Sequence, residues 1–125
     1  MPSKPAPAKR VARAAALLFL PAWAGVFGGE VSQQGTGINI WDKAEHFGAY
    51  FVLALLASMA AGSRRAVLWA GLGLVVMGGL LEILQGLIGR DCDIHDEYAN
   101  TLGVISGVIL GRAIIALLVR MRRAD

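Results

Sequence analysis

The chain of 125 residues is long enough for one compact domain and has a strongly apolar composition. Hydrophobic residues make up 56% of it, aromatic residues only 7%, and 16 residues are glycine. Aliphatic and small side chains in this proportion are typical of helices that pack closely in a lipid bilayer. The net charge of +3 comes from basic residues that flank apolar segments, which argues against a nucleic-acid partner. Cys92 is the only cysteine of the sequence, so an intrachain disulfide is excluded.

The first predicted element is a membrane helix over residues 11–29, after a disordered basic leader at residues 1–10. The leader contains three prolines and three basic residues and lacks apolar periodicity. Residues 22–24 read Ala-Trp-Ala, a small-x-small pattern, so a cleaved signal peptide is the competing interpretation of this segment. The apolar run continues past that pattern to Gly29, which favours a retained membrane helix.

Three further membrane helices are predicted over residues 43–62, 66–89 and 100–119. A short basic turn at residues 63–65 separates the first two of these, and an acidic loop at residues 90–97 precedes the last. Residues 120–125 are predicted to form a basic tail. The expected fold is therefore all-α: a polytopic bundle of four transmembrane helices in one membrane domain over residues 11–119.

Lysine and arginine are distributed unevenly between the two ends of these helices. Most of them lie in the leader, in the turn at residues 63–65 and in the tail, whereas Lys43 and Arg90 lie at the opposite helix ends. Because basic residues near membrane helices are retained in the cytoplasm, this division predicts that both termini are cytoplasmic.

A polar stripe occurs at the predicted outer end of the second helix. Lys43, His46 and Tyr50 are spaced i, i+3 and i+7, so they share one helix face, and Asp42 flanks them. On the third helix, Glu82 and Gln85 fall on one face at a matching depth. A carboxylate in the hydrocarbon core costs about 2.5–3.5 kcal/mol, so Glu82 is expected to find a partner. The nearest candidates are His46 and Lys43.

The fourth helix carries a stripe of small residues below one amide. Its members are Asn100, Gly103, Gly107 and Gly111. Glycines four residues apart allow two helix backbones to approach closely, which predicts a packing groove. Asn100, at the outer end, would then meet Glu82 and His46 in one shared polar site. The same polar residues could instead serve only as hydrogen bonds that fix the helix packing, and the sequence leaves both interpretations open.

The acidic loop contains metal-ligand chemistry in Asp91, Asp93, His95, Asp96 and Glu97, but its spacing fits neither an EF-hand nor a helical zinc motif. We therefore expect no metal and no other cofactor. Common enzyme motifs are also absent from the sequence. Glu82 and His46 are the candidate catalytic residues if the site performs chemistry.

The ordered polar residues resemble the VanZ-like family of small bacterial membrane proteins over about residues 40–110. The resemblance is carried by Asp42, Lys43, His46, Tyr50, Glu82, Gln85, Arg90, Asp93, Asp96, Asn100, Gly103 and Gly107. It implies a multi-pass protein of the bacterial inner membrane and a link to resistance against glycopeptide antibiotics such as teicoplanin.

Three functions follow as hypotheses. In the first, the outer polar site binds an anionic or lipid-linked component of the cell envelope, with Lys43 and Arg90 facing the anion. In the second, the protein is a membrane-embedded hydrolase or transferase that acts on an envelope lipid, with Glu82 or His46 as general base. In the third, it is a non-catalytic subunit or homo-oligomer whose glycine stripe docks another membrane protein.

Overall fold

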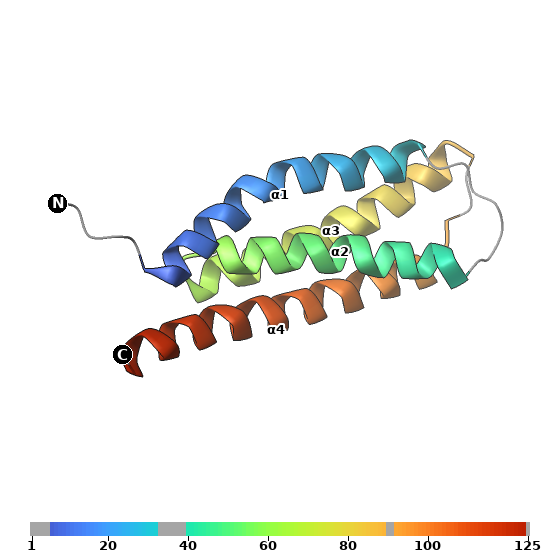
Figure 1. Ribbon diagram of the computed structural model, residues 1–125. Helices are drawn as coiled ribbons and strands as arrows, with labels where there is room; N and C mark the ends of the chain where they lie inside the picture. The colour runs from blue at the N-terminus through green and yellow to red at the C-terminus, as the bar shows by residue number, and fades with distance from the viewer. Residues whose placement is uncertain (1–5, 33–39, 90–91, 125) are drawn as a thin grey trace.

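The computed structural model describes residues 6–32, 40–89 and 92–124 as four helices. These are α1 (Pro7–Ser32), α2 (Ile40–Ala60), α3 (Arg64–Leu87) and α4 (Ile94–Ala124). They run antiparallel in sequence order, and α1 begins at the same end of the bundle at which α4 finishes (Figure 1). The described ranges contain no strand, so the prediction of an all-α fold is confirmed.

The first and last helices extend furthest beyond the predicted bounds. α1 begins at Pro7, so residues 7–10 are helical although they were predicted to be disordered; proline at the first helical position loses no hydrogen bond. Ala6 precedes the helix, and residues 1–5 of the predicted leader lie outside the described residues. α4 continues through the predicted tail to Ala124, because the basic residues in its last turn suit the negative end of the helix dipole.

The ends of α3 and the start of α4 have clear local causes. α3 begins after Ser63, whose hydroxyl oxygen accepts a hydrogen bond from the backbone N–H of Ala66 at 3.1 Å. It ends before Gly89, whose φ of +83° is the left-handed conformation that glycine adopts readily. α4 begins earlier than predicted, because the Asp93 carboxylate accepts the backbone N–H of His95 at 2.9 Å and so caps the helix.

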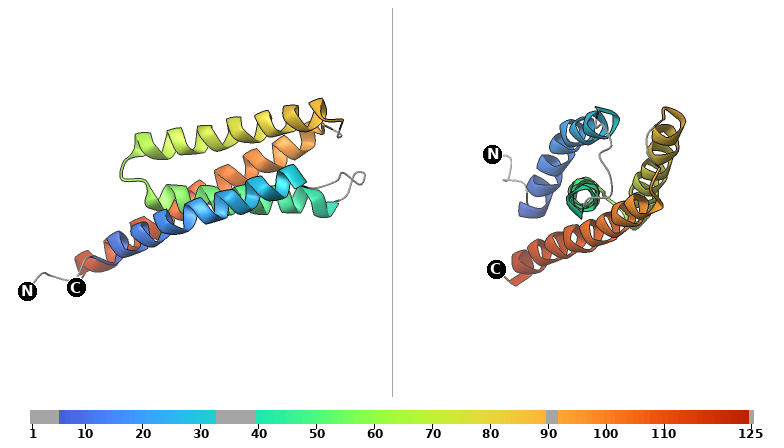
Figure 2. Two further views of the ribbon diagram at one scale, coloured as in Figure 1. Left: turned by 90° about the horizontal axis from the view of Figure 1, so that it is seen from above. Right: turned by 90° about the vertical axis from the view of Figure 1, so that its right-hand side faces the viewer.

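α2 occupies the centre of the bundle and is surrounded by α1, α3 and α4 (Figure 2). The buried core is centred on its side chains Tyr50, Leu53 and Ala54, which pack against Leu74 of α3 and Val104 of α4. Large exposed apolar side chains are numerous on the other three helices, whereas α2 contributes few of them. The apolar surface of the bundle therefore belongs mainly to the helices around α2.

Three helices are long and apolar enough to cross a membrane: Pro7–Gly29 within α1, Arg64–Leu87 and Ile94–Ala124. Their exposed apolar side chains indicate a membrane protein, because lipid is the solvent in which such surfaces are stable. α2, the fourth predicted span, does not reach the same apolarity, since its first two turns carry several charged residues. Within that polar segment His46 is buried, whereas Asp42 and Lys43 are partly exposed.

The glycine stripe of α4 lies directly against the backbone of α2. A Cβ atom added at Gly103 would collide with the carbonyl oxygen of Phe47, and one at Gly107 would collide with that of Phe51. At Gly111 the added atom would meet the hydroxyl of Ser58. The stripe is thus used within the chain, and a partner or second copy would need another face.

An arginine of α4 secures the other end of the α2–α4 contact. The Arg112 guanidinium donates hydrogen bonds to the carbonyl oxygens of Ser58 at 3.2 Å and Ala61 at 3.5 Å. These carbonyls lie in the final turn of α2 and directly after it, where a positive charge also complements the helix dipole. Arg112 therefore caps a neighbouring helix, a role beyond the membrane anchoring that its position suggests.

Substitution of Gly107 by alanine should destabilise the fold. Its new methyl group would overlap the Phe51 carbonyl, and overpacking of this kind costs roughly 1–3 kcal/mol. Gly73→Ala is the matched control, because nothing lies within 4 Å of a Cβ at Gly73, and alanine favours a helix by about 1 kcal/mol. Thermal unfolding in detergent, followed by circular dichroism, should rank Gly107→Ala below the wild type and Gly73→Ala at or above it. Equal stability of the two variants would contradict the close α2–α4 contact.

Candidate functional site

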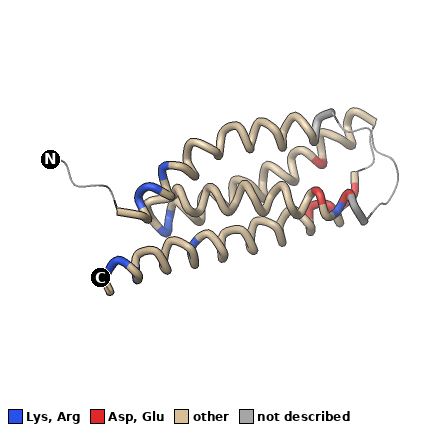
Figure 3. The backbone as a smooth tube through the Cα atoms, viewed as in Figure 1, with Lys and Arg blue, Asp and Glu red and all other residues tan. Residues whose placement is uncertain are grey.

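Charged residues are separated between the two ends of the bundle. Lysine and arginine gather where α1 begins and α4 finishes, and aspartate and glutamate gather at the opposite end (Figure 3). The acidic end is where α2 and α4 begin and α3 finishes. Side chains from these three helices form the candidate site.

Lys43 links the start of α2 to the start of α4. Its ammonium lies 2.8 Å from the Asp93 carboxylate and 2.9 Å from that of Asp96. Only 10% of the Asp96 side chain is exposed, so this ion pair compensates a largely desolvated charge. The sequence suggested that Lys43 would face a ligand, but its charge is already shared between two carboxylates of the protein.

Asp93 combines several of these contacts. Its carboxylate accepts hydrogen bonds from the Lys43 ammonium and the backbone N–H of His95, and it lies 2.7 Å from the His95 ring Nδ1. These contacts favour the charged form, so they hold the pKa of Asp93 well below its usual range, and the Lys43 contact contributes most. Asp93 is therefore charged at neutral pH and ties the N-terminus of α4 to α2.

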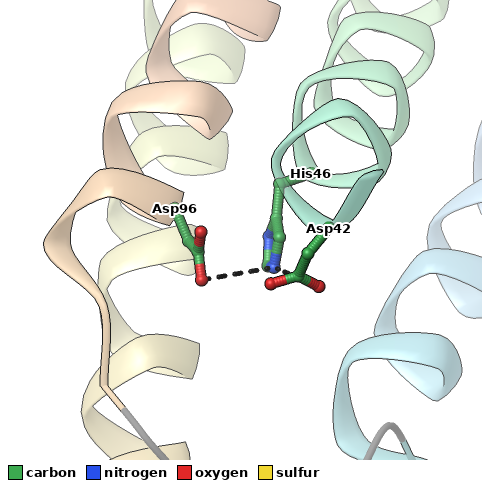
Figure 4. A group of neighbouring side chains, drawn as sticks. All are labelled: Asp42, His46 and Asp96. Carbon is green, nitrogen blue, oxygen red and sulfur yellow. Dashed lines mark ion pairs between the residues drawn. The ribbon is translucent and has the colours of Figure 1, made fainter. Parts of the chain in front are cut away.

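His46 is held between an amide and two carboxylates. Its Nδ1 lies 3.1 Å from the side-chain oxygen of Asn100, and its Nε2 lies 3.8 Å from Asp96 and 3.9 Å from Asp42. Figure 4 shows the ring pointing into the space that these two carboxylates border. His46 is only 6% exposed and Asn100 only 1%, so both side chains are buried in the bundle.

The orientation of Asn100 determines which His46 nitrogen carries a proton. The Asn100 amide nitrogen donates to the Glu97 carboxylate at 3.3 Å, so its oxygen is the atom that faces His46. An amide oxygen accepts hydrogen bonds, so this network assigns the proton of the neutral ring to Nδ1. In the neutral ring, the lone pair of Nε2 then points toward Asp42 and Asp96.

Glu82 and Gln85 are buried side by side on α3, with 5% and 7% exposure. The Glu82 carboxylate accepts the backbone N–H of Asp93 at 3.3 Å. This contact forms because α4 begins earlier than predicted, which brings the Asp93 backbone to the end of α3. The expected partnership of Glu82 with Lys43 or His46 stays a prediction. Arg90, the other predicted cation of the site, lies outside the described residues.

Glycine makes room for the centre of the site. A Cβ atom at Gly78 of α3 would lie 2.6 Å from the Glu97 carboxylate, 3.0 Å from the Asn100 amide and 3.3 Å from the Tyr50 hydroxyl. Side chains from α2 and α4 therefore meet next to the α3 backbone at Gly78, where α3 has no side chain. Tyr50, which was predicted to share the face of His46, is fully buried at this point.

Glu97 is the site residue that the sequence interpretation missed. The sequence analysis names it only as a member of the acidic loop, whereas it lies in the first turn of α4, where its charge also complements the helix dipole. Its carboxylate also accepts from Asn100 and from the Thr101 hydroxyl, at 3.3 and 3.4 Å. The i, i+3, i+4 spacing of these three residues was the available signal, but it is informative only once residues 94–99 are known to be helical.

Within the described part of the chain, the site holds more acidic than basic groups. Asp42, Glu82, Asp93, Asp96 and Glu97 surround Lys43 and His46. An arrangement of buried carboxylates next to an imidazole can transfer protons or hold a cation.

Comparison with known proteins adds no functional assignment, because no family model, no curated protein and no solved structure matches the chain. What the site does is therefore inferred from its own residues and their geometry.

Asp93→Asn should lose stability in a pH-dependent way. Asparagine still caps a helix, so the variant isolates the loss of the charge. Because the pKa of Asp93 is lower in the folded chain than its unfolded value of about 3.9, the charged carboxylate stabilises the fold above about pH 4. That contribution disappears as pH falls through the folded pKa.

Thermal midpoints of wild type and Asp93→Asn in detergent should thus differ by a constant amount from pH 7 to about pH 4 and converge below it. In a Lys43→Met background the same substitution should have a smaller effect, since the main partner is gone. A difference that persists unchanged at the acidic extreme would refute the ion pair.

Proposed function

We propose that the chain is a multi-pass protein of the bacterial cytoplasmic membrane, with four spans and both termini in the cytoplasm. We further propose that its polar site binds the anionic head group of a lipid-linked envelope component at the outer face. The observation that carries this proposal is the convergence of His46, Glu82, Asp96 and Asn100, all buried, from three helices at the end opposite the basic residues.

The charge separation supports the orientation. Basic residues near membrane helices favour the cytoplasmic side, and here they gather where α1 begins, α2 finishes and α4 finishes. α2 serves as the fourth span because α1, α3 and α4 surround its polar turns. The polar site then lies at the outer membrane boundary.

The burial of ionisable groups supports a binding role. Intramembrane carboxylates and histidines are costly, and they commonly mark binding or transport sites. Glu82 and His46 are 5% and 6% exposed, and several helices are arranged around them. A bundle that needed only to stay folded could use apolar side chains at these positions at lower cost.

The resemblance to the VanZ-like family supports the same placement, because several of the residues that carry it, among them His46, Asp96 and Asn100, meet at this site. Through that resemblance we include a contribution to glycopeptide resistance, such as resistance to teicoplanin, in the proposal. The chemical task at the site stays the same: recognition of a head group at the membrane boundary.

One specific observation favours an enzyme as the second candidate. His46 is oriented by Asn100 on one nitrogen while its other nitrogen faces two carboxylates. A base positioned by a third group is the usual arrangement in general base catalysis. His46 or Glu82 would then activate a nucleophile for hydrolysis or transfer on the bound lipid, and measured turnover would separate this candidate from binding alone.

Labelling of cysteines in intact cells tests the topology. Cys92 is exposed between α3 and α4, so a membrane-impermeant maleimide added outside should label it. Gly62→Cys in a Cys92→Ser background is the control, because residue 62 lies between α2 and α3 and its Cβ meets nothing within 4 Å. That variant should react only after the membrane is permeabilised. The reverse labelling pattern would overturn the proposed orientation.

Lipid binding can be measured by native mass spectrometry of the protein released from phosphatidylcholine nanodiscs that contain a small fraction of polyprenyl phosphate. The wild type should retain polyprenyl phosphate, and Glu82→Gln and His46→Ala should retain it at least about tenfold less, a difference of about 1.4 kcal/mol. Glu45→Gln, an exposed acid at the same end of α2, should behave as wild type.

The same variants should rank identically when cells that express them are tested for teicoplanin sensitivity. Folded Glu82→Gln and His46→Ala proteins that retain the lipid as well as wild type does would refute the binding site.

A further inference from the structure

We propose that Asp42, His46 and Asp96 bind a divalent transition-metal cation such as Zn²⁺ or Mn²⁺. Each residue offers one ligand atom, and the three atoms lie within 4.8 Å of one another. Two carboxylate oxygens and one imidazole nitrogen form a donor set that suits these ions. The residues come from two helices, α2 and α4, and their side chains converge on one point (Figure 4).

The distances within this group are slightly longer than those between ligands of one ion. Nε2 of His46 lies 3.9 Å from the Asp42 oxygen and 3.8 Å from the Asp96 oxygen. These separations exceed a hydrogen bond, which is about 2.7–3.2 Å. Metal bonds of about 2.0–2.2 Å from each atom to a shared centre require only a small contraction.

A second observation, the contact on the other nitrogen of His46, points to the same ligand. The Asn100 oxygen lies 3.1 Å from His46 Nδ1, and with the proton on that nitrogen the Nε2 lone pair faces the two carboxylates. A hydrogen bond on the far nitrogen is what orients metal-binding histidines. Asn100 is itself held by Glu97, so this orientation is built into the buried network.

The Asp96 carboxylate is also oriented by a hydrogen bond. Lys43 bonds one oxygen of Asp96, Oδ1, while the other, Oδ2, faces His46. Ligating carboxylates are usually oriented by such hydrogen bonds on their second oxygen. The Asp42 side chain is 38% exposed, so an ion can reach the group from the outer surface.

A bound cation would also offset the excess negative charge of the site. The described site residues include more carboxylates than cations, and Lys43 is paired with two of them. Three protein ligands leave a coordination position open, and a phosphate oxygen could fill it. The idea that the ion presents an anionic lipid head group to the site rests on the proposed function; the ion site itself does not.

Metal binding can be measured directly on the full chain. Purified protein in detergent, stripped with EDTA and dialysed, would be titrated with ZnCl₂ or MnCl₂ alone in a calorimeter. We expect one ion per chain in the wild type, and at least tenfold weaker binding in Asp42→Ala and in His46→Gln. Asn100→Ala should weaken binding by about 10–100-fold, the usual effect of removing an orienting partner. Glu45→Gln, an exposed acid on the same helix, should bind as wild type.

Cobalt provides a readout of ligand identity. The visible absorption of bound Co²⁺ should change in His46→Gln and stay unchanged in Glu45→Gln. Size-exclusion chromatography and circular dichroism would establish that each variant is folded, and Asp42→Ala is the decisive one because its side chain is partly exposed. The proposal would be overturned if the wild type showed no saturable metal binding, or if folded Asp42→Ala bound the metal as tightly as the wild type. A protonated His46 paired with the two carboxylates would then explain why these three side chains lie together.

The two proposals fail in different ways. Retention of polyprenyl phosphate by a wild-type protein that binds no metal would refute the ion site and leave the lipid site standing. Stoichiometric metal binding by a protein that retains no lipid would support the ion site and refute the proposed ligand. Loss of lipid retention after EDTA treatment, restored by the metal, would support both.

Discussion

The close approach of α4 to α2 is the contact on which the rest of this structure depends. Gly103, Gly107 and Gly111 place the α4 backbone directly on that of α2, and a side chain at any of them would collide with it. This contact fixes how far α4 is shifted along α2, so the residues at the outer ends of the two helices lie at the same level. Asn100 therefore meets His46, and Asp96 meets Lys43.

This contact explains why a helix with a charged end can form the centre of a bundle suited to lipid. α2 is surrounded by α1, α3 and α4, which carry most of the exposed apolar surface. Two of its polar residues make contacts within the bundle: Lys43 meets two carboxylates and His46 meets an amide. Desolvation of charged groups is costly, but it is offset here because their partners come from the neighbouring helix.

The electrostatic balance of the site limits what it can bind. Lys43 stabilises the start of α4, so it cannot offer its charge to a ligand without leaving Asp93 and Asp96 unpaired. An anionic head group would need a positive charge from elsewhere. A cation held by Asp42, His46 and Asp96 would supply that charge while leaving the helix contacts intact, which links the acidic character of the site to an anionic ligand.

The sequence by itself determined the helical fold, the separation of charge and most residues of the site, because helix periodicity and apolar length are local properties. Spacing alone placed Lys43, His46 and Tyr50 on one face and identified the glycine stripe that packs on α2. Pairing between helices could not be read in this way. Only the tertiary structure decided that Lys43 binds Asp93 and Asp96, that Glu82 accepts a backbone N–H, and that Glu97 joins the site. Those contacts depend on where α4 begins and how far it is turned about its axis, and both are set by packing against α2 and α3 over long separations in the sequence.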